Sequence, residues 1–250
     1  MKGRSLVCAL MFSIMLIFSS AAMSQDKTIE IATEPTWEPY FGEKMKNGGL
    51  MVDIATEAFK KVGYKMNMNW MPWKRAMNQS FEGKYDGLLG CYFTEERAEK
   101  LKYSDPITTA EVALFEQTGK NTRYTKLQEL APYTIGVGRG YANTDEFDKA
   151  TYLKKEEGKD TVTNIKKLMK GRLDLMIDSK KVVMHILNTQ FAADKAKLSV
   201  VEPILQSRNL HIGFSKKNPN VEKIVNDFNK GLEIIKADGT YEKVLKRQGF

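Results

Sequence analysis

Short apolar segments alternate with helix-length segments along the first ninety residues, and this alternation constrains the fold most. Residues 28–33, 65–70 and 85–90 have the length and side chains of strands. Residues 54–62 and 74–81 lie between them and repeat apolar side chains at helical spacing. A strand–helix–strand–helix–strand order is typical of parallel strands joined by helical crossovers. The sequence therefore predicts an α/β lobe.

Aspartate and glycine mark the expected helix ends. Asp53 is placed to cap the helix at 54–62, and Gly63 is placed to end it. Gly83 and Gly171 each end a predicted helix, and each is followed by a basic residue and then an aspartate at the start of a strand. This repeated pattern indicates two lobes of similar construction.

The second half of the chain repeats the alternation. Residues 133–137 and 173–177 are expected strands, and residues 144–150 and 161–169 are expected helices after a helical turn at 126–130. These segments predict a second α/β lobe.

The C-terminal segment bears on how the lobes connect. We expect a strand at 209–215, an amphipathic helix at 221–236 and a last helix at 241–247. If these pack on the first lobe, the chain crosses between the lobes near residues 108–113 and 206–211. Two crossovers would form a hinge over a cleft that can close on a ligand.

The N-terminus has the pattern of a secretory signal. Lys2 and Arg4 precede an uncharged apolar stretch at 6–18, and small residues precede Gln25. The apolar stretch is too short to span a bilayer comfortably. We expect residues 1–24 to be removed and the mature protein to be soluble, exported and periplasmic.

Cysteine content and charge fit that location. Only Cys91 remains after residue 24, so the mature chain cannot form an intramolecular disulfide. Loss of Lys2 and Arg4 lowers the formal charge from +8 to +6. No block of lysine and arginine resembles a nucleic-acid-binding tail, so no nucleic-acid partner is expected.

Motifs spread over residues 27–250 resemble those of the family 3 periplasmic solute-binding proteins, the polar amino-acid receptors of ABC importers. They are TWEPY (36–40), GLMVDI (49–54), GKYDGLL (83–89), TEER (94–97), YSDP (103–106), IGV (135–137) with Gly140, GRLD (171–174) and DGTYEK (238–243). The resemblance implies a type II periplasmic-binding-protein fold with two mixed sheets flanked by helices. It places lobe 1 at 25–110 plus 210–250 and lobe 2 at 111–209.

The resemblance also implies a function. Such a protein captures an amino acid or similar small carboxylate between its lobes and delivers it to an ABC permease in the inner membrane. A monomer without cofactor or metal is expected. The alternative is an enzyme on the same fold, similar to the cyclohexadienyl dehydratases, which would need a placed acid or base.

Arg97 resembles the arginine that holds the ligand carboxylate in this family. A planar guanidinium offers paired donors to two carboxylate oxygens and stays charged at any relevant pH. From the local sequence alone, the alternative is a surface ion pair within a helical turn, for example with Glu95.

Other positions in the first lobe match pocket residues of the family. Trp37 and Tyr40 correspond to aromatic walls, although Pro39 could equally fix them in the core. Trp73 corresponds to a stacking aromatic, and Glu34 to an acid that meets a basic ligand side chain in some relatives. The segment before Arg97 adds three candidates at the carboxyl end of a strand: Gly90, Tyr92 and Thr94.

The second lobe supplies three further candidates. Arg139 would bring a second positive charge to the cleft unless it is solvent-exposed. Tyr141 stands where relatives carry a small hydroxyl residue, which indicates an altered pocket. Asp178 lies one position before the family's amine-binding aspartate, and Ser179 holds the matching place.

Other chemistries lack support in the sequence. The glycines at 136, 138 and 140 do not complete a dinucleotide-binding motif, because position 141 is Tyr141. His185 and His211 are far apart and have no clustered cysteine, so no metal site is expected. Cys91 has no adjacent base and is expected to be a buried thiol.

Overall fold

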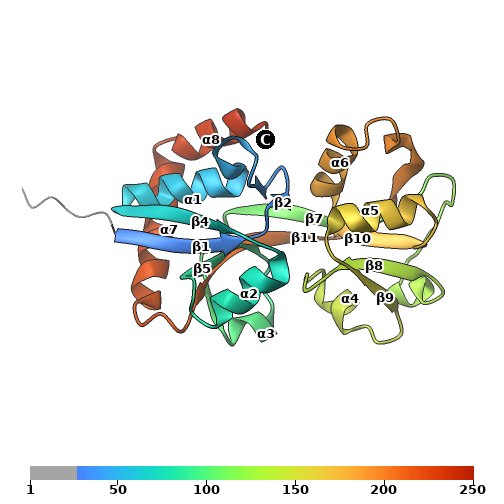
Figure 1. The fold of residues 1–250 in the computed structure, drawn as a ribbon, viewed down its shortest axis with the longest axis horizontal. Coiled ribbons are helices and arrows are strands. Elements are labelled where there is room, and N and C mark those ends of the chain that lie inside the picture. Colours follow the sequence, from blue (N-terminus) through green and yellow to red (C-terminus); the bar gives the residue numbers. More distant parts are fainter. Residues whose placement is uncertain (1–26) are drawn as a thin grey trace, which may run out of the picture.

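The computed structural model describes residues 27–250, which form two α/β lobes side by side, joined by two long strands (Figure 1). The predicted signal at residues 1–24 lies outside the described residues.

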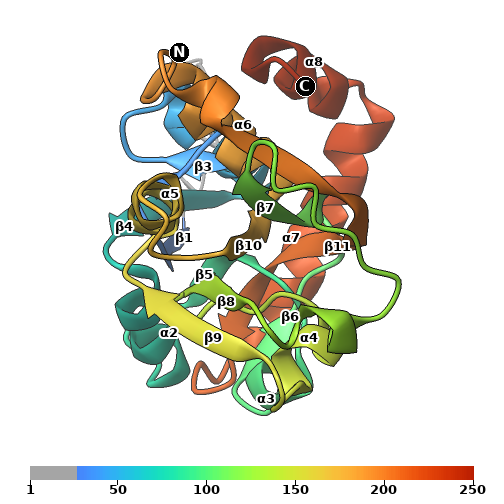
Figure 2. The ribbon, with the colours of Figure 1, turned by 90° about the vertical axis from the view of Figure 1, so that its right-hand side faces the viewer.

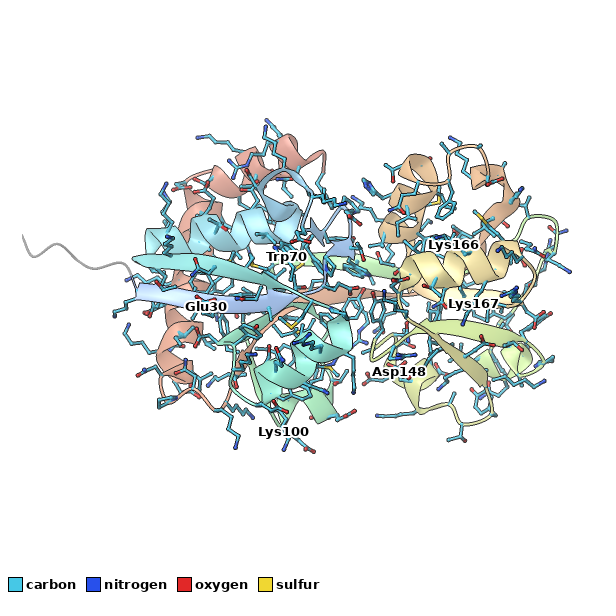
Figure 3. The ribbon with its side chains drawn as sticks, viewed as in Figure 1. Glu30, Trp70, Lys100, Asp148, Lys166 and Lys167 are labelled. Carbon is cyan, nitrogen blue, oxygen red and sulfur yellow. The ribbon has the colours of Figure 1, made fainter. Side chains whose placement is uncertain are left out.

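The first lobe contains three parallel strands. Strand β1 (Lys27–Thr33) lies between β4 (Tyr64–Trp70) and β5 (Gly87–Cys91), and all three run in the same direction. Their carboxyl ends point to the second lobe, and Figure 3 labels Trp70 at that end of β4. The loops after these strands therefore meet at the boundary between the lobes, which is where α/β proteins bind ligands.

The second lobe has a shorter sheet. Strand β10 (Leu175–Ser179) pairs in parallel with β8 (Thr134–Gly138), which in turn pairs in parallel with β9 (Lys154–Gly158). Figure 2, in which this lobe faces the viewer, shows β9 at the sheet edge. Strand β9 is absent from the expected elements because its residues, KKEEG, are mostly charged and carry no apolar pattern.

Two antiparallel strands connect the lobes. Strand β7 (Thr108–Gln117) pairs with β11 (Leu198–Ser215) in two stretches separated by a register shift between Val201 and Gln206, and the C-terminal half of β11 also pairs with β5 and with β6 (Leu101–Tyr103). The expected crossovers at 108–113 and 206–211 pair with each other inside this ribbon.

The continuity of the ribbon corrects one expectation. The two predicted sheets are joined into a single hydrogen-bonded sheet of order β4-β1-β5-β11-β7-β10-β8-β9, with β6 beside β11. The predicted lobe boundaries after residues 110 and 209 fall within β7 and β11, where the backbone pairing is unbroken. They stay a prediction about where the hinge bends.

Helices cover the sheet of each lobe (Figure 1). In the first lobe, α1 packs against α7 and α8 on one face of the sheet, and the rings of Phe59, Phe214 and Phe228 pack together in tilted and edge-on arrangements with centroids 4.9–6.2 Å apart. The first-lobe helices are α1 (Leu50–Lys61), α2 (Trp73–Phe81), α3 (Glu95–Ala98), α7 (Val221–Ala237) and α8 (Thr240–Gln248). Those of the second lobe are α4 (Asp145–Lys149), α5 (Thr161–Met169) and α6 (Lys180–Thr189).

Short elements complete the chain. Strands β2 (Thr36–Trp37) and β3 (Phe41–Gly42) form a small hairpin, and within residues 27–250 three 3₁₀ turns lie at Lys46–Gly48, Leu127–Leu130 and Lys195–Lys197.

The expected cap of the first helix is wrong. Helix α1 begins at Leu50 after Gly49, so Asp53 lies inside its first turn and accepts no capping bond. The buried Asp53 carboxylate instead binds the Arg247 guanidinium and the Gln248 amide of α8. Asp53 therefore binds side chains of the C-terminal helix instead of capping α1, as its position in the sequence had suggested.

Candidate ligand-binding site

A small buried cavity lies between the lobes at the carboxyl ends of the first-lobe strands. Its volume is about 30 Å³. First-lobe side chains on its wall are Glu34, Trp37, Phe41, Trp73, Tyr92 and Arg97, with Gly90 among them. The opposite wall consists of Val112 on β7 and Tyr141, Ala142, Asn143, Asp178 and Ser179 of the second lobe.

Arg97 is buried in this wall, with 5% of its surface exposed. Thr94 caps α3 by accepting a hydrogen bond from the Arg97 backbone N–H at 3.2 Å, which fixes where the side chain starts. The guanidinium donates from Nη1 to the Tyr92 carbonyl at 3.1 Å and from Nη2 to the Gly140 carbonyl at 3.0 Å. The guanidinium carbon also lies 5.6 Å from the Trp73 ring.

Neutral partners therefore surround this cation. Among the described residues, no ion pair joins Arg97 to Glu95 or to any other acid. A guanidinium that is buried without a counter-charge can gain two charge-assisted hydrogen bonds from a carboxylate.

Two buried carboxyl groups share the cavity with Arg97. Glu34 Oε2 accepts a hydrogen bond from the Tyr141 hydroxyl at 2.7 Å. Burial raises the pKa of Glu34 well above its usual range, an effect that the Tyr141 hydrogen bond opposes and that the charge of Asp178 reinforces.

Asp178 lies on the second-lobe wall. It accepts from the Thr161 hydroxyl at 2.6 Å, the Ser179 N–H at 2.7 Å and the Trp37 indole at 3.3 Å. Burial raises its pKa to about 6, although these three donors lower it. Both Asp178 and Ser179 face the cavity, so the shift of one position in the sequence does not remove the carboxylate from the cleft.

The aromatic candidates take different places. Trp37 lies on the wall and stacks on Phe41 with centroids 5.1 Å apart and planes 25° from parallel. Tyr40 lies behind Trp37, also at 5.1 Å, and its hydroxyl donates to the Thr109 carbonyl of β7. Tyr40 therefore supports the wall and attaches it to β7 rather than lining the cavity.

Position 90 requires glycine because of its backbone conformation and because of the neighbouring Phe41 ring. Its φ is +88°, in the region that favours glycine. A Cβ at this position would lie 2.2 Å from Cε1 of Phe41, which is closer than real contacts allow. The missing side chain lets the Phe41 ring pack directly on the end of β5.

Two further candidates lie outside the cavity. Arg139 is exposed and pairs with Glu157 at 3.4 Å, on the rim of a separate groove beside α2. Thr94 acts through its cap on α3 and lines a second groove at the outer edge of the cleft. Arg139 is outside because β8 ends at Gly138 and the chain turns there, with the Arg139 N–H bonded to the Gly158 carbonyl.

Several residues of the site were not expected from the sequence. Phe41, Asn143 and Thr161 become neighbours of the candidates only through folding. Arg208 on β11 donates to the Phe93 carbonyl of one lobe and the Asn143 carbonyl of the other. No local pattern marks Arg208, because its surrounding strand is polar and irregular.

Other kinds of site find no support in the described part of the chain. Within residues 27–250, no group of three or more His, Cys, Asp and Glu side chains is arranged to hold a metal ion. Cys91 is a buried thiol whose pKa burial raises to about 11, which leaves it protonated. No helix in the same range is both long enough and apolar enough to cross a membrane.

A model of the family described as bacterial extracellular solute-binding proteins, family 3, matches residues 29–248. The chain belongs to this family. The expected resemblance is thereby confirmed, and family 3 proteins of this kind are binding proteins rather than enzymes.

Named relatives agree with this assignment. The arginine-binding periplasmic protein of Mannheimia haemolytica is 24% identical and aligns over 93% of this chain and 95% of its own. The histidine-binding periplasmic protein of Escherichia coli is also 24% identical, with 95% of each chain covered.

Solved structures support the fold of this family 3 protein. An ancestral arginine-binding protein bound to arginine is 26% identical, with a TM-score of 0.75 over 88% of this chain and 97% of that one. The two-lobed α/β fold expected from the sequence is confirmed.

Proposed function

We propose that this protein captures an amino acid or closely related small carboxylate in the cleft between its lobes and delivers it to an ABC importer in the inner membrane. Family membership supports solute binding in amino-acid transport. The observation that carries the proposal is the buried guanidinium of Arg97, which faces the second lobe without an acidic partner. The relatives and the N-terminal sequence pattern support a periplasmic location.

Charge balance favours a cationic amino acid. The cavity holds one guanidinium, Arg97, and two carboxyl groups, Glu34 and Asp178. A ligand carboxylate at Arg97 and an α-ammonium at Asp178 would satisfy one pair, which leaves Glu34 for a second positive group. The names of the arginine-binding and histidine-binding relatives support the same class of ligand.

Closure around the ligand would use the β7–β11 ribbon. A ligand that contacts both lobes binds the closed form more strongly than the open form. It shifts the equilibrium towards the closed form by the difference between these two binding free energies. Tyr40 and Arg208 attach the cleft walls to this ribbon, so wall and hinge would move together.

Thermal unfolding of the protein without residues 1–24, in the presence of single amino acids, tests the proposal. A ligand at 100 times its Kd stabilises the folded state by about 2.7 kcal/mol. We expect arginine, lysine or ornithine to raise the Tm most, glutamate to have no effect, and native mass spectrometry to detect a retained cationic amino acid. Stabilisation by glutamate alone would contradict the charge assignment, and no stabilisation by any amino acid would contradict the proposed function.

A further inference from the structure

The loop from β8 to α4, residues 139–144, inserts two polar groups of its own into the candidate site. The Gly140 carbonyl accepts from Arg97 Nη2 and from the Trp73 indole N–H, each at 3.0 Å. The adjacent Tyr141 hydroxyl donates to Glu34 at 2.7 Å. One loop of the second lobe thus satisfies both a cation and a carboxyl of the first lobe.

The conformation of this loop holds Tyr141 in place. Gly140 has φ +76°, and the Tyr141 N–H bonds to the Gly138 carbonyl at 3.0 Å in a tight turn. A Cβ at Gly138 would lie 2.4 Å from the Tyr141 ring, so the ring packs where a side chain would otherwise stand. Asn143, at the end of the loop, is bound through its backbone N–H and side-chain amide to Asp148, which Figure 3 labels.

The Tyr141 ring fills the cavity beside Glu34. It meets the Trp73 ring edge-on, with centroids 6.2 Å apart and planes at 83°. With this ring present, the volume of the cavity is about 30 Å³, and the phenol occupies the space next to the Glu34 carboxyl on its wall. A ligand side chain long enough to reach Glu34 must therefore move the phenol, whereas a ligand that ends short of Glu34 can leave the phenol in its bond.

We propose that Tyr141 is a specificity-determining residue that competes with the distal group of a ligand for Glu34. This inference rests on the proposed function. A ligand that reaches Glu34 gives up the Tyr141–Glu34 bond and must replace it, and an ammonium or guanidinium does so with a stronger, charge-assisted bond. A shorter ligand keeps the Tyr141–Glu34 bond. Tyr141 therefore reduces the ratio of the affinity for long cationic ligands to the affinity for short ones.

A homologous series of ligands tests this competition. We propose to measure the Kd values of 2,3-diaminopropionate, 2,4-diaminobutyrate, ornithine and lysine by calorimetry for the wild type and Tyr141→Phe. The ratio of lysine affinity to diaminopropionate affinity should rise about tenfold in Tyr141→Phe, because one hydrogen bond to a carboxyl is then absent only from the short-ligand complex. Tyr152→Phe, which removes the hydroxyl of an exposed second-lobe tyrosine, is the matched control and should leave the ratio unchanged. A ratio that stays within twofold, or that falls, overturns the proposal.

A double-mutant cycle in the ligand-free protein separates the two levels of inference. If Tyr141 and Glu34 are bonded in solution, the effects of Tyr141→Phe and Glu34→Ala on urea unfolding will be clearly non-additive, because each change removes one partner of the hydrogen bond. Additive effects would show that Tyr141 and Glu34 are not bonded in solution, and would overturn the proposed competition whichever ligand the protein binds. Non-additive effects combined with no binding of any amino acid would instead overturn the proposed function, and with it the role of Tyr141 in selection.

Discussion

Trp37 and Asp178 meet across the cleft, with the indole N–H donating to the carboxyl at 3.3 Å although 141 residues separate them in the chain. The first belongs to the β2–β3 hairpin and the second to β10. Their contact places an acid of the second lobe against the aromatic wall of the first, in a cavity that also holds Arg97.

Ligand affinity should depend on pH through Asp178. Burial raises the pKa of this carboxyl to about 6, and a ligand ammonium binds only its ionised form. Affinity for a cationic amino acid should therefore fall about tenfold as the pH is lowered from 7 to 5. Calorimetry at each pH measures this, and Asp178→Asn should bind more weakly with a flatter profile. A wild-type affinity that is constant over this range would contradict the role of Asp178.

The stability of the ligand-free protein should change with pH in the opposite direction to the ligand affinity. Between its unfolded pKa, near 3.8, and about 6, the folded protein holds a proton on Asp178 that the unfolded chain has released. The free energy of unfolding should thus fall as the pH rises through this window, by up to about 3 kcal/mol from this group. Comparing urea unfolding of the wild type and Asp178→Asn at pH 4 and pH 7 isolates the contribution.

Replacing Arg97 should weaken ligand binding without unfolding the protein. Arg97→Ala removes the buried guanidinium, and affinity should fall at least tenfold, about 1.4 kcal/mol. Arg97→Lys keeps the charge but loses the paired donors, so it should recover only part of the affinity. Arg139→Ala is the matched control, because Arg139 is exposed and outside the cavity. Equal losses in both alanine variants would point to long-range charge rather than contact.

Gly90 should tolerate no side chain. Gly90→Ala combines a positive φ with a Cβ 2.2 Å from Phe41, and we expect it to destabilise the protein by roughly 2–4 kcal/mol. Gly63→Ala has a similar φ of +77° but nothing within 4 Å of its Cβ, so it should cost about 1 kcal/mol. Urea unfolding of the two variants separates the clash from the backbone strain. Equal losses in the free energy of unfolding would show that the Phe41 ring moves away from the added Cβ without destabilising the protein.

The contact between Asp53 and Arg247 should attach the C-terminal helix to the first lobe. Arg247→Ala leaves the buried Asp53 carboxylate without its cation and should lower the free energy of unfolding by about 2 kcal/mol, since Arg247 is itself one-third exposed. Lys223→Ala breaks the exposed pair with Asp227 on α7 and should cost less than about 0.5 kcal/mol. If the two variants lose the same stability, the burial of Asp53 has no energetic consequence.

Much of the fold was predictable because its signals are local. Residues 54–62, 74–81 and 161–169 show helical periodicity, and helices α1, α2 and α5 are found there. Strand β9 was not predicted because its residues are mostly charged, and the first part of β11 was not predicted because Pro203 interrupts its apolar residues; both strands pair with distant parts of the chain. Pairing across a sheet depends on neighbours that a local pattern does not contain.

The candidate site divides in the same way. The sequence by itself determined the kind of group at each position: a guanidinium at Arg97, an aromatic at Trp37, an acid at Glu34. Only the tertiary structure decided that Tyr40 supports the wall, that Arg139 faces solvent, and that the Gly140–Tyr141 loop bonds to Arg97 and Glu34. The physical reason is that hydrogen bonds across the cleft join residues that are tens to more than a hundred positions apart, and the packing of the two lobes on the β7–β11 ribbon sets their geometry.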